Sequence, residues 1–161
     1  MKLVKEFVPY IIILVVVVLL RTFVVTPILV QGESMEDILY NGEVLLLKKY
    51  DRNYNRFDIV VISSSVEGDS LVKRVIGWPG ESIRYKNNRL YIDGEIVEDP
   101  YDNGTTSNFQ EILLGDDEYF VLGDNREVSL DSRMLGWFDI SKIIGTTKFT
   151  IYPFNRLGSK N

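Results

Sequence analysis

Residues 84–97 have the sequence RYKNNRLYIDGEIV, and this stretch decides the fold class. It holds three short runs of aromatic and aliphatic residues, which are typical of strands. The pairs Asn87-Asn88 and Asp93-Gly94 separate these runs, and both are typical of tight turns between antiparallel strands. The stretch therefore predicts a small meander of three strands.

Similar runs occur on both sides of the meander. Short aliphatic, aromatic or β-branched runs lie at residues 28–30, 44–47, 59–62, 119–122 and 148–152. Residues 99–118 contain Pro100, Gly104, Gly115 and an acidic cluster, so we expect a long loop there. No long segment of helical periodicity follows residue 27. The pattern predicts a mainly β fold, with residues 28–161 forming one folded domain.

An apolar segment precedes this domain. Residues 7–20, FVPYIIILVVVVLL, carry no charge, and the segment extended to Val25 reaches the length of a membrane helix. Arg21 lies near one end, where its stem can reach the interface. A cleaved signal peptide is the alternative, but its apolar core is usually shorter and no Ala-x-Ala cleavage site follows. We therefore expect residues 1–27 to be a retained transmembrane anchor.

The positive charges around the anchor predict its orientation. Lys2 and Lys5 precede the apolar run, whereas Arg21 alone follows it closely. The positive-inside rule then places the N-terminus in the cytoplasm and the β-rich domain outside. The expected location is the cell membrane, crossed once.

Composition excludes several kinds of protein. The formal net charge is −5, which argues against nucleic acid as a partner. The chain has no cysteine and no histidine. Thiolate nucleophiles and Ser-His-Asp triads are thus excluded, and the commonest metal ligands are missing. The general base of a hydrolase would have to be Lys, Asp, Glu or Tyr.

Two residues are candidates for such chemistry. Ser34 lies in the segment QGESM, residues 31–35, and Lys73 lies in LVKRVIG, residues 71–77. Either residue alone would be an ordinary loop serine or a solvated strand lysine. The apolar neighbours of Lys73 could desolvate its amine, which lowers a lysine pKa and makes it a base near neutral pH. A serine nucleophile needs such a base within hydrogen-bond reach.

Five segments resemble a known family, in order behind the apolar run. They are Gly32-Glu33-Ser34-Met35, Asn41-Gly42-Glu43-Val44, Arg56-Phe57-Asp58-Ile59-Val60-Val61, residues 72–81 (VKRVIGWPGE) and residues 123–133 (GDNREVSLDSR). With them the chain resembles the bacterial type I signal peptidases, particularly the short Gram-positive kind. The resemblance runs along nearly the whole chain.

The resemblance implies roles for single residues. Ser34 matches the nucleophile and Lys73 matches the general base. Ser129 matches a hydroxyl that helps to orient the lysine, and Asp131 and Arg133 match an ion pair that supports the site. The backbone N–H of Ser34 would form part of an oxyanion hole.

The chain departs from the family pattern beside the nucleophile. Asp37 and Ile38 stand where the family usually has Pro-Thr, and Gln31 stands where some relatives have an oxyanion-hole serine. The Gln31 amide could donate instead if it turns inward. Glu33, Glu36 and Asp37 all lie within three residues of Ser34, and carboxylates there would favour a protonated lysine.

The resemblance implies a membrane-bound serine endopeptidase that removes signal peptides from exported preproteins. Its implied partners are these signal peptides, lying extended beside a strand, and the lipid of the cytoplasmic membrane. It implies no organic cofactor and no metal. A weakly active or inactive relative that helps to assemble surface structures such as pili is the alternative. A self-cleaving repressor shares serine–lysine chemistry, but the apolar segment and the lack of a DNA-reading helix argue against it.

Overall fold

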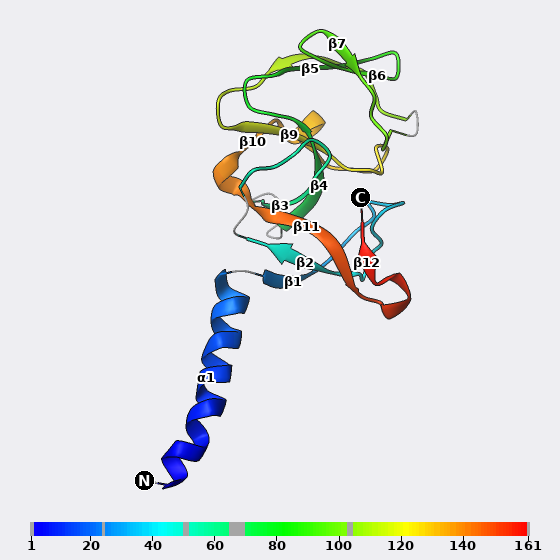
Figure 1. The fold of residues 1–161 in the computed structure, drawn as a ribbon. Helices are drawn as coiled ribbons and strands as arrows, with labels where there is room; N and C mark the ends of the chain where they lie inside the picture. Colours follow the sequence, from blue (N-terminus) through cyan, green and yellow to red (C-terminus); the bar gives the residue numbers. More distant parts are fainter. Residues whose placement is uncertain (1, 24, 50–51, 65–69, 103–104, 161) are drawn as a thin grey trace.

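The structure, a computed structural model, describes residues 2–23, 25–49, 52–64, 70–102 and 105–160. In the N-terminal helix it describes the side chains of residues 6–19. Figure 1 shows one long helix that extends away from a body built of two sheets. The helical elements are α1 (Lys2–Phe23), α2 (Ser132–Leu135), η1 (Ile140–Lys142) and η2 (Phe154–Arg156).

Helix α1 coincides with the predicted apolar segment. Its described side chains from Phe7 to Leu19 are exposed on every face of the helix. Among the residues described, no helix is both long and apolar enough to cross a membrane. The side chains of Lys2, Lys5 and Arg21, on which the predicted orientation rests, lie outside the described ones.

The predicted mainly β fold is confirmed, because two antiparallel sheets make up the body. The strands are β1 (Val25–Leu29), β2 (Val44–Lys48), β3 (Ile59–Ser63), β4 (Ser70–Gly77), β5 (Ser82–Lys86), β6 (Arg89–Ile92), β7 (Glu95–Val97), β8 (Phe109–Leu113), β9 (Glu118–Leu122), β10 (Phe138–Asp139), β11 (Ile143–Tyr152) and β12 (Gly158–Ser159). The larger sheet has the order β1-β2-β11-β3-β4-β9-β10, with β12 on β11, and the smaller has the order β7-β6-β5-β8.

The predicted meander forms strands β5, β6 and β7 of the smaller sheet. Lys86 pairs with Arg89 and Ile92 pairs with Glu95, so each connection has two residues. Those connecting residues, Asn87-Asn88 and Asp93-Gly94, all have positive φ, between 51° and 82°. This is the conformation that tight hairpin turns require and that Asn, Asp and Gly tolerate.

The prediction of one long loop over residues 99–118 is wrong. Strand β8 lies inside this range and pairs with β5, with Tyr85 opposite Phe109 and Ile83 opposite Ile112. Phe109 and Ile112 also pack against a buried cluster. Polar and acidic neighbours masked this short run in the sequence, and distant contacts with β5 make it a strand.

Three buried clusters form the core. One lies around Val75 and Val121, a second around Ile83 and Phe120 next to the smaller sheet, and a third around Met35. The third joins Val30, Met35, Leu39, Leu45 and Ile59, all at most 3% exposed. Because Met35 belongs to it, the core fixes the backbone directly after Ser34.

Candidate active site

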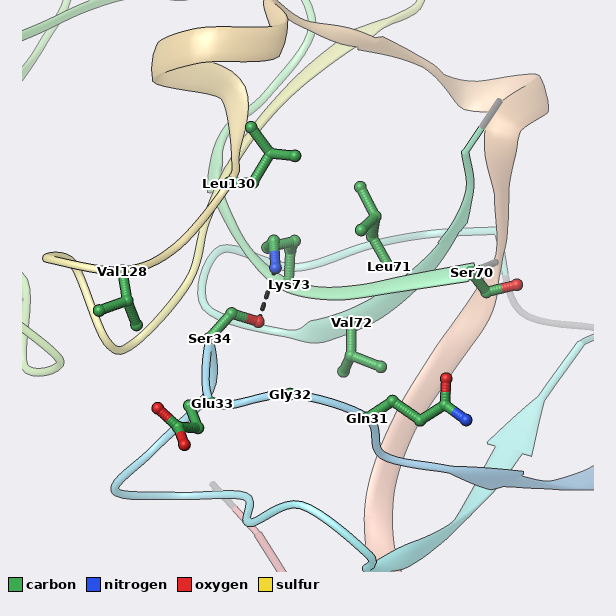
Figure 2. Close-up of a pocket in the computed structure, with 10 residues that line it drawn as sticks. All are labelled: Gln31, Gly32, Glu33, Ser34, Ser70, Leu71, Val72, Lys73, Val128 and Leu130. Carbon is green, nitrogen blue, oxygen red and sulfur yellow. Dashed lines mark hydrogen bonds between the residues drawn. The ribbon is translucent and has the colours of Figure 1, made fainter. Parts of the chain in front are cut away.

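A cleft of about 430 Å³ opens on the larger sheet. It is bounded by the segment after β1, by β4 and by the loop of residues 123–133, which we call the 123–133 loop. Its lining residues, drawn in Figure 2, are Gln31, Gly32, Glu33, Ser34, Ser70, Leu71, Val72, Lys73, Val128 and Leu130. Both residues singled out from the sequence therefore line one cleft.

Ser34 is held by a short segment whose ends are fixed. Gly32 has φ +86°, which favours glycine, and its N–H donates to the side-chain oxygen of Asn41 over 3.1 Å. On the other side, the buried Met35 carbonyl accepts from the N–H of Leu39 over 2.8 Å. Ser34 thus lies between a tight turn and the buried Met35. Its hydroxyl faces the cleft (Figure 2).

Lys73 comes from the middle of β4, where it pairs with Val60 of β3. Its side chain is 2% exposed and shares a strand face with Leu71 and Val75, which are also buried. The Lys73 Nζ lies 2.7 Å from the Ser34 Oγ (Figure 2). A buried amine at hydrogen-bond distance from a hydroxyl can act as the base that activates it.

The 123–133 loop contacts the backbone of Ser34. The N–H of Asn125 donates to the carbonyl oxygen of Ser34 over 3.1 Å, and the N–H of Ser129 donates to the Asn125 carbonyl over 3.1 Å. The Ser129 hydroxyl is buried and has no hydrogen-bond partner among the described residues. Its role in orienting the lysine stays a prediction.

Two ion pairs come from the segments that hold Ser34 and Lys73. Asp131 and Arg133, the ion pair that the resemblance implies, lie 2.8 Å apart, and Asp131 is fully buried. Arg74 is next to Lys73 on β4. Its Nε and Nη2 donate to the two carboxylate oxygens of Asp124 over 2.7 and 2.6 Å. The guanidinium of Arg74 also lies 3.4 Å from the ring centre of Tyr101. Such charges are tolerated inside a protein because they are paired.

Sequence reasoning missed the roles of Arg74, Asp124 and Asn125. All three lie within the segments that carry the family resemblance, so the resemblance located them but gave no function for them. Only the buried contacts across the fold reveal that Asn125 holds Ser34 and that Arg74 pairs with Asp124.

The acidic side chains near Ser34 in sequence lie at two different sites. Glu33 lines the cleft, but Figure 2 shows its carboxylate turned away from Lys73. Glu36 and Asp37 instead line a separate cavity with Tyr101. Figure 2 also shows the Gln31 amide pointing away from Ser34. In the described part of the chain, no three or more acidic residues gather closely enough to hold a metal ion.

Comparisons with known proteins agree on one kind of enzyme. Residues 3–152 match the family described as "Signal peptidase, peptidase S26". The signal peptidase I of Bacillus amyloliquefaciens is 41% identical over 162 residues, which cover 91% of this chain and 86% of that protein. The signal peptidase I S of Bacillus subtilis (strain 168) is 40% identical over 165 residues, which cover 91% and 88%. The crystal structure of a signal peptidase I from Enterococcus faecalis V583 has a TM-score of 0.54 and 32% identity, covering 58% of this chain and 96% of that one.

Proposed function

Because the chain belongs to the signal peptidase family, peptidase S26, and is a serine endopeptidase that cleaves signal peptides, we propose that Ser34 is its nucleophile and Lys73 its general base. The observation that carries this assignment is the 2.7 Å between the Lys73 Nζ and the Ser34 Oγ. The burial of Lys73 supports it, because a desolvated amine loses its proton more readily than a solvated one.

The reaction then has two halves. The neutral Lys73 amine takes the hydroxyl proton as the Ser34 Oγ attacks the scissile carbonyl carbon. The carbon–nitrogen bond breaks, and the lysine gives its proton to the leaving amine of the mature protein. Water next attacks the ester, with Lys73 again as base, and releases the signal peptide as a carboxylate. The backbone N–H of Ser34 would stabilise the oxyanion.

The cleft suits an extended peptide with small apolar side chains. Leu71, Val72, Val128 and Leu130 supply its apolar lining. The segment after β1 and strand β4 form its two long walls, so a peptide can lie between them and pair with backbone groups.

We also propose that residues 1–27 anchor the enzyme in the cytoplasmic membrane and that residues 28–161 form the extracytoplasmic domain. The uncharged run of residues 7–20 supports this proposal. So does the exposure of the apolar side chains from Phe7 to Leu19 on a helix that extends away from the β-rich body (Figure 1).

Cleavage of a matched preprotein by the full chain in detergent tests the dyad. We expect Ser34→Ala and Lys73→Ala each to lower kcat at least 1,000-fold and the double variant to be little worse, because the two residues act as one unit. Ser141→Ala and Lys142→Ala, at the exposed residues of η1, are matched controls and should cleave like the wild type.

Substantial activity in either single variant would reject the dyad. A wild type that cuts no preprotein but still binds one would favour the non-enzymatic assembly role.

A further inference from the structure

Arg126 has a guanidinium that the fold encloses completely, with 0% of the side chain exposed. Its three nitrogens all donate. Nε donates to the Gly123 carbonyl over 2.8 Å, Nη1 to the Thr106 hydroxyl over 2.7 Å, and Nη2 to the Asp99 carboxylate over 2.8 Å. Arg126 is therefore fixed at one end within the 123–133 loop and at the other by the segment between β7 and β8.

That segment is itself held to the smaller sheet. Asp102 accepts from the Thr106 hydroxyl over 2.7 Å and from the Tyr85 hydroxyl of β5, and it lies 3.8 Å from Arg126. Burial and the bond to Asp102 raise the pKa of the Tyr85 hydroxyl above its ordinary value, so the phenol keeps the proton that it donates. We call Asp99, Asp102, Thr106 and Arg126 the buried junction.

The junction reaches the dyad through backbone contacts. Arg126 directly follows Asn125, whose N–H holds the Ser34 carbonyl. The carbonyl of Arg126 accepts from Arg133 Nη2 over 2.7 Å, and Arg133 pairs with Asp131. Asp131 in turn accepts from the N–H of Gly123 over 3.1 Å. These bonds thus tie the two ends of the 123–133 loop to each other and to the Arg126 backbone.

We propose that Arg126 is a positioning residue for peptide cleavage, through which the junction at the smaller sheet holds the 123–133 loop against Ser34. This inference rests on the proposed roles of Ser34 and Lys73. None of the four junction residues lines the dyad's cleft, so they act on the rate through the loop and not by touching substrate.

The physical reason is that the reaction rate depends steeply on where the catalytic groups lie. A shift of about 1 Å in a catalytic group can cost about 100-fold in rate. Loss of the bond from Arg126 to Asp99 removes the charged contact between the loop and the segment before β8, so that Asn125, which holds the Ser34 carbonyl, is free to shift. Substrate binding along β4 is left intact, since no junction residue belongs to that wall.

The test compares the full-length enzyme with Arg126→Lys, Asp99→Asn and Thr106→Val. Arg126→Lys keeps the charge but loses the three-way donation, and Asp99→Asn keeps the shape of the carboxylate without its charge. We expect kcat on a matched preprotein to fall at least tenfold with KM within twofold, and the limb of the kcat/KM pH profile to move. Deuterium exchange of residues 123–133 should become faster in each variant.

Arg56→Lys is the matched control. Arg56 also links the larger sheet to the segment before β5, donating to the Ile76 carbonyl and pairing with Glu81 at 2.6 Å, and among the described residues its hydrogen bonds do not include the 123–133 loop. It should lose thermal stability comparably while keeping wild-type kcat and loop exchange. This separates positioning from stability, because all rates are measured where each variant is fully folded by circular dichroism.

Unchanged kcat and exchange in folded Arg126→Lys and Asp99→Asn would overturn the inference while leaving the dyad intact. An equal fall in kcat for Arg56→Lys would also overturn it, since the effect would then be general destabilisation. A wild type that cuts nothing would overturn the proposed dyad together with this inference.

Discussion

The charge nearest Ser34, the proposed nucleophile, in sequence belongs to Glu33, which is exposed and lines the same cleft. A carboxylate near a lysine favours the ammonium form of that lysine, but solvent and the outward direction of the Glu33 side chain weaken its attraction for Lys73. Asp37 lines another cavity beside Tyr101, so its influence on Lys73 should be weaker still.

We therefore predict a small effect of Glu33→Gln on the limb where kcat/KM rises with pH. This limb should move to lower pH by less than about half a pH unit. The sign follows because removing a negative charge makes the free amine of Lys73 more populated at a given pH. Asp37→Asn, the matched control, should leave the profile unchanged. A larger shift for Asp37→Asn than for Glu33→Gln would contradict the placement of these side chains.

Gly123 is the tightest backbone approach in the site. A Cβ there would lie 2.2 Å from the Ser129 Oγ and 2.4 Å from the Ser34 carbonyl oxygen. We predict that Gly123→Ala lowers the free energy of unfolding by about 1–3 kcal/mol and abolishes most cleavage, since the loop or Ser34 must move. Urea denaturation and the preprotein assay measure the two effects.

Gly94→Ala is a useful comparison for Gly123→Ala. No atom lies within 4 Å of a Cβ at Gly94, but its φ of +82° makes the change strained. It should therefore cost stability without costing activity in the folded enzyme. Full activity of Gly123→Ala would show that the loop shifts freely.

Among the described elements, α1 has the most exposed side chains. The exposed fraction is 56% at Ile12 and 47% at Val16, near the middle of the helix. In water such a surface would be costly, whereas acyl chains would cover it. This exposure gives the proposed anchor its physical basis.

We predict that Ile12→Asp weakens membrane association, because an aspartate at the centre of a membrane helix costs about 3 kcal/mol. Flotation of the full chain with liposomes measures the bound fraction, and Ile12→Leu is the control with unchanged polarity. Equal flotation of the Asp variant and the wild type would contradict insertion of α1.

At the scale of the whole molecule, the proposed anchor and the catalytic body must lie in different places relative to the membrane. Lys2 and Lys5 precede the apolar run, and in the proposed orientation the positive-inside rule would keep them in the cytoplasm. The cleft would then face the side to which preproteins are exported.

We predict that protease added to intact protoplasts digests the chain from about Val30 onward. A cytoplasmic marker protein in the same cells should survive, which controls for lysis. Protection of the domain until the cells are lysed would reverse the orientation and remove the cleft from its proposed substrates.

Local sequence determined those parts of the fold that depend on neighbouring residues. The turns at Asn87-Asn88 and Asp93-Gly94 were predictable because positive φ is a property of single residue types. Strands β3 and β9 were predictable because each is a continuous apolar run between polar residues. Ser34 and Lys73 were identified from their flanking residues, the lack of histidine and the family resemblance.

Tertiary structure alone decided what depends on distant partners. Strand β8 exists because β5 pairs with it, and its own residues gave no strand pattern. Lys73 meets Ser34 across 39 positions, and Arg74 meets Asp124 across 50. The outward turn of Glu33 and the enclosure of Arg126 are equally invisible in the sequence. The reason is that the burial and direction of a charged side chain are set by the groups that long-range packing brings to it, whereas turns and strands follow from torsional preferences and alternation within a few residues.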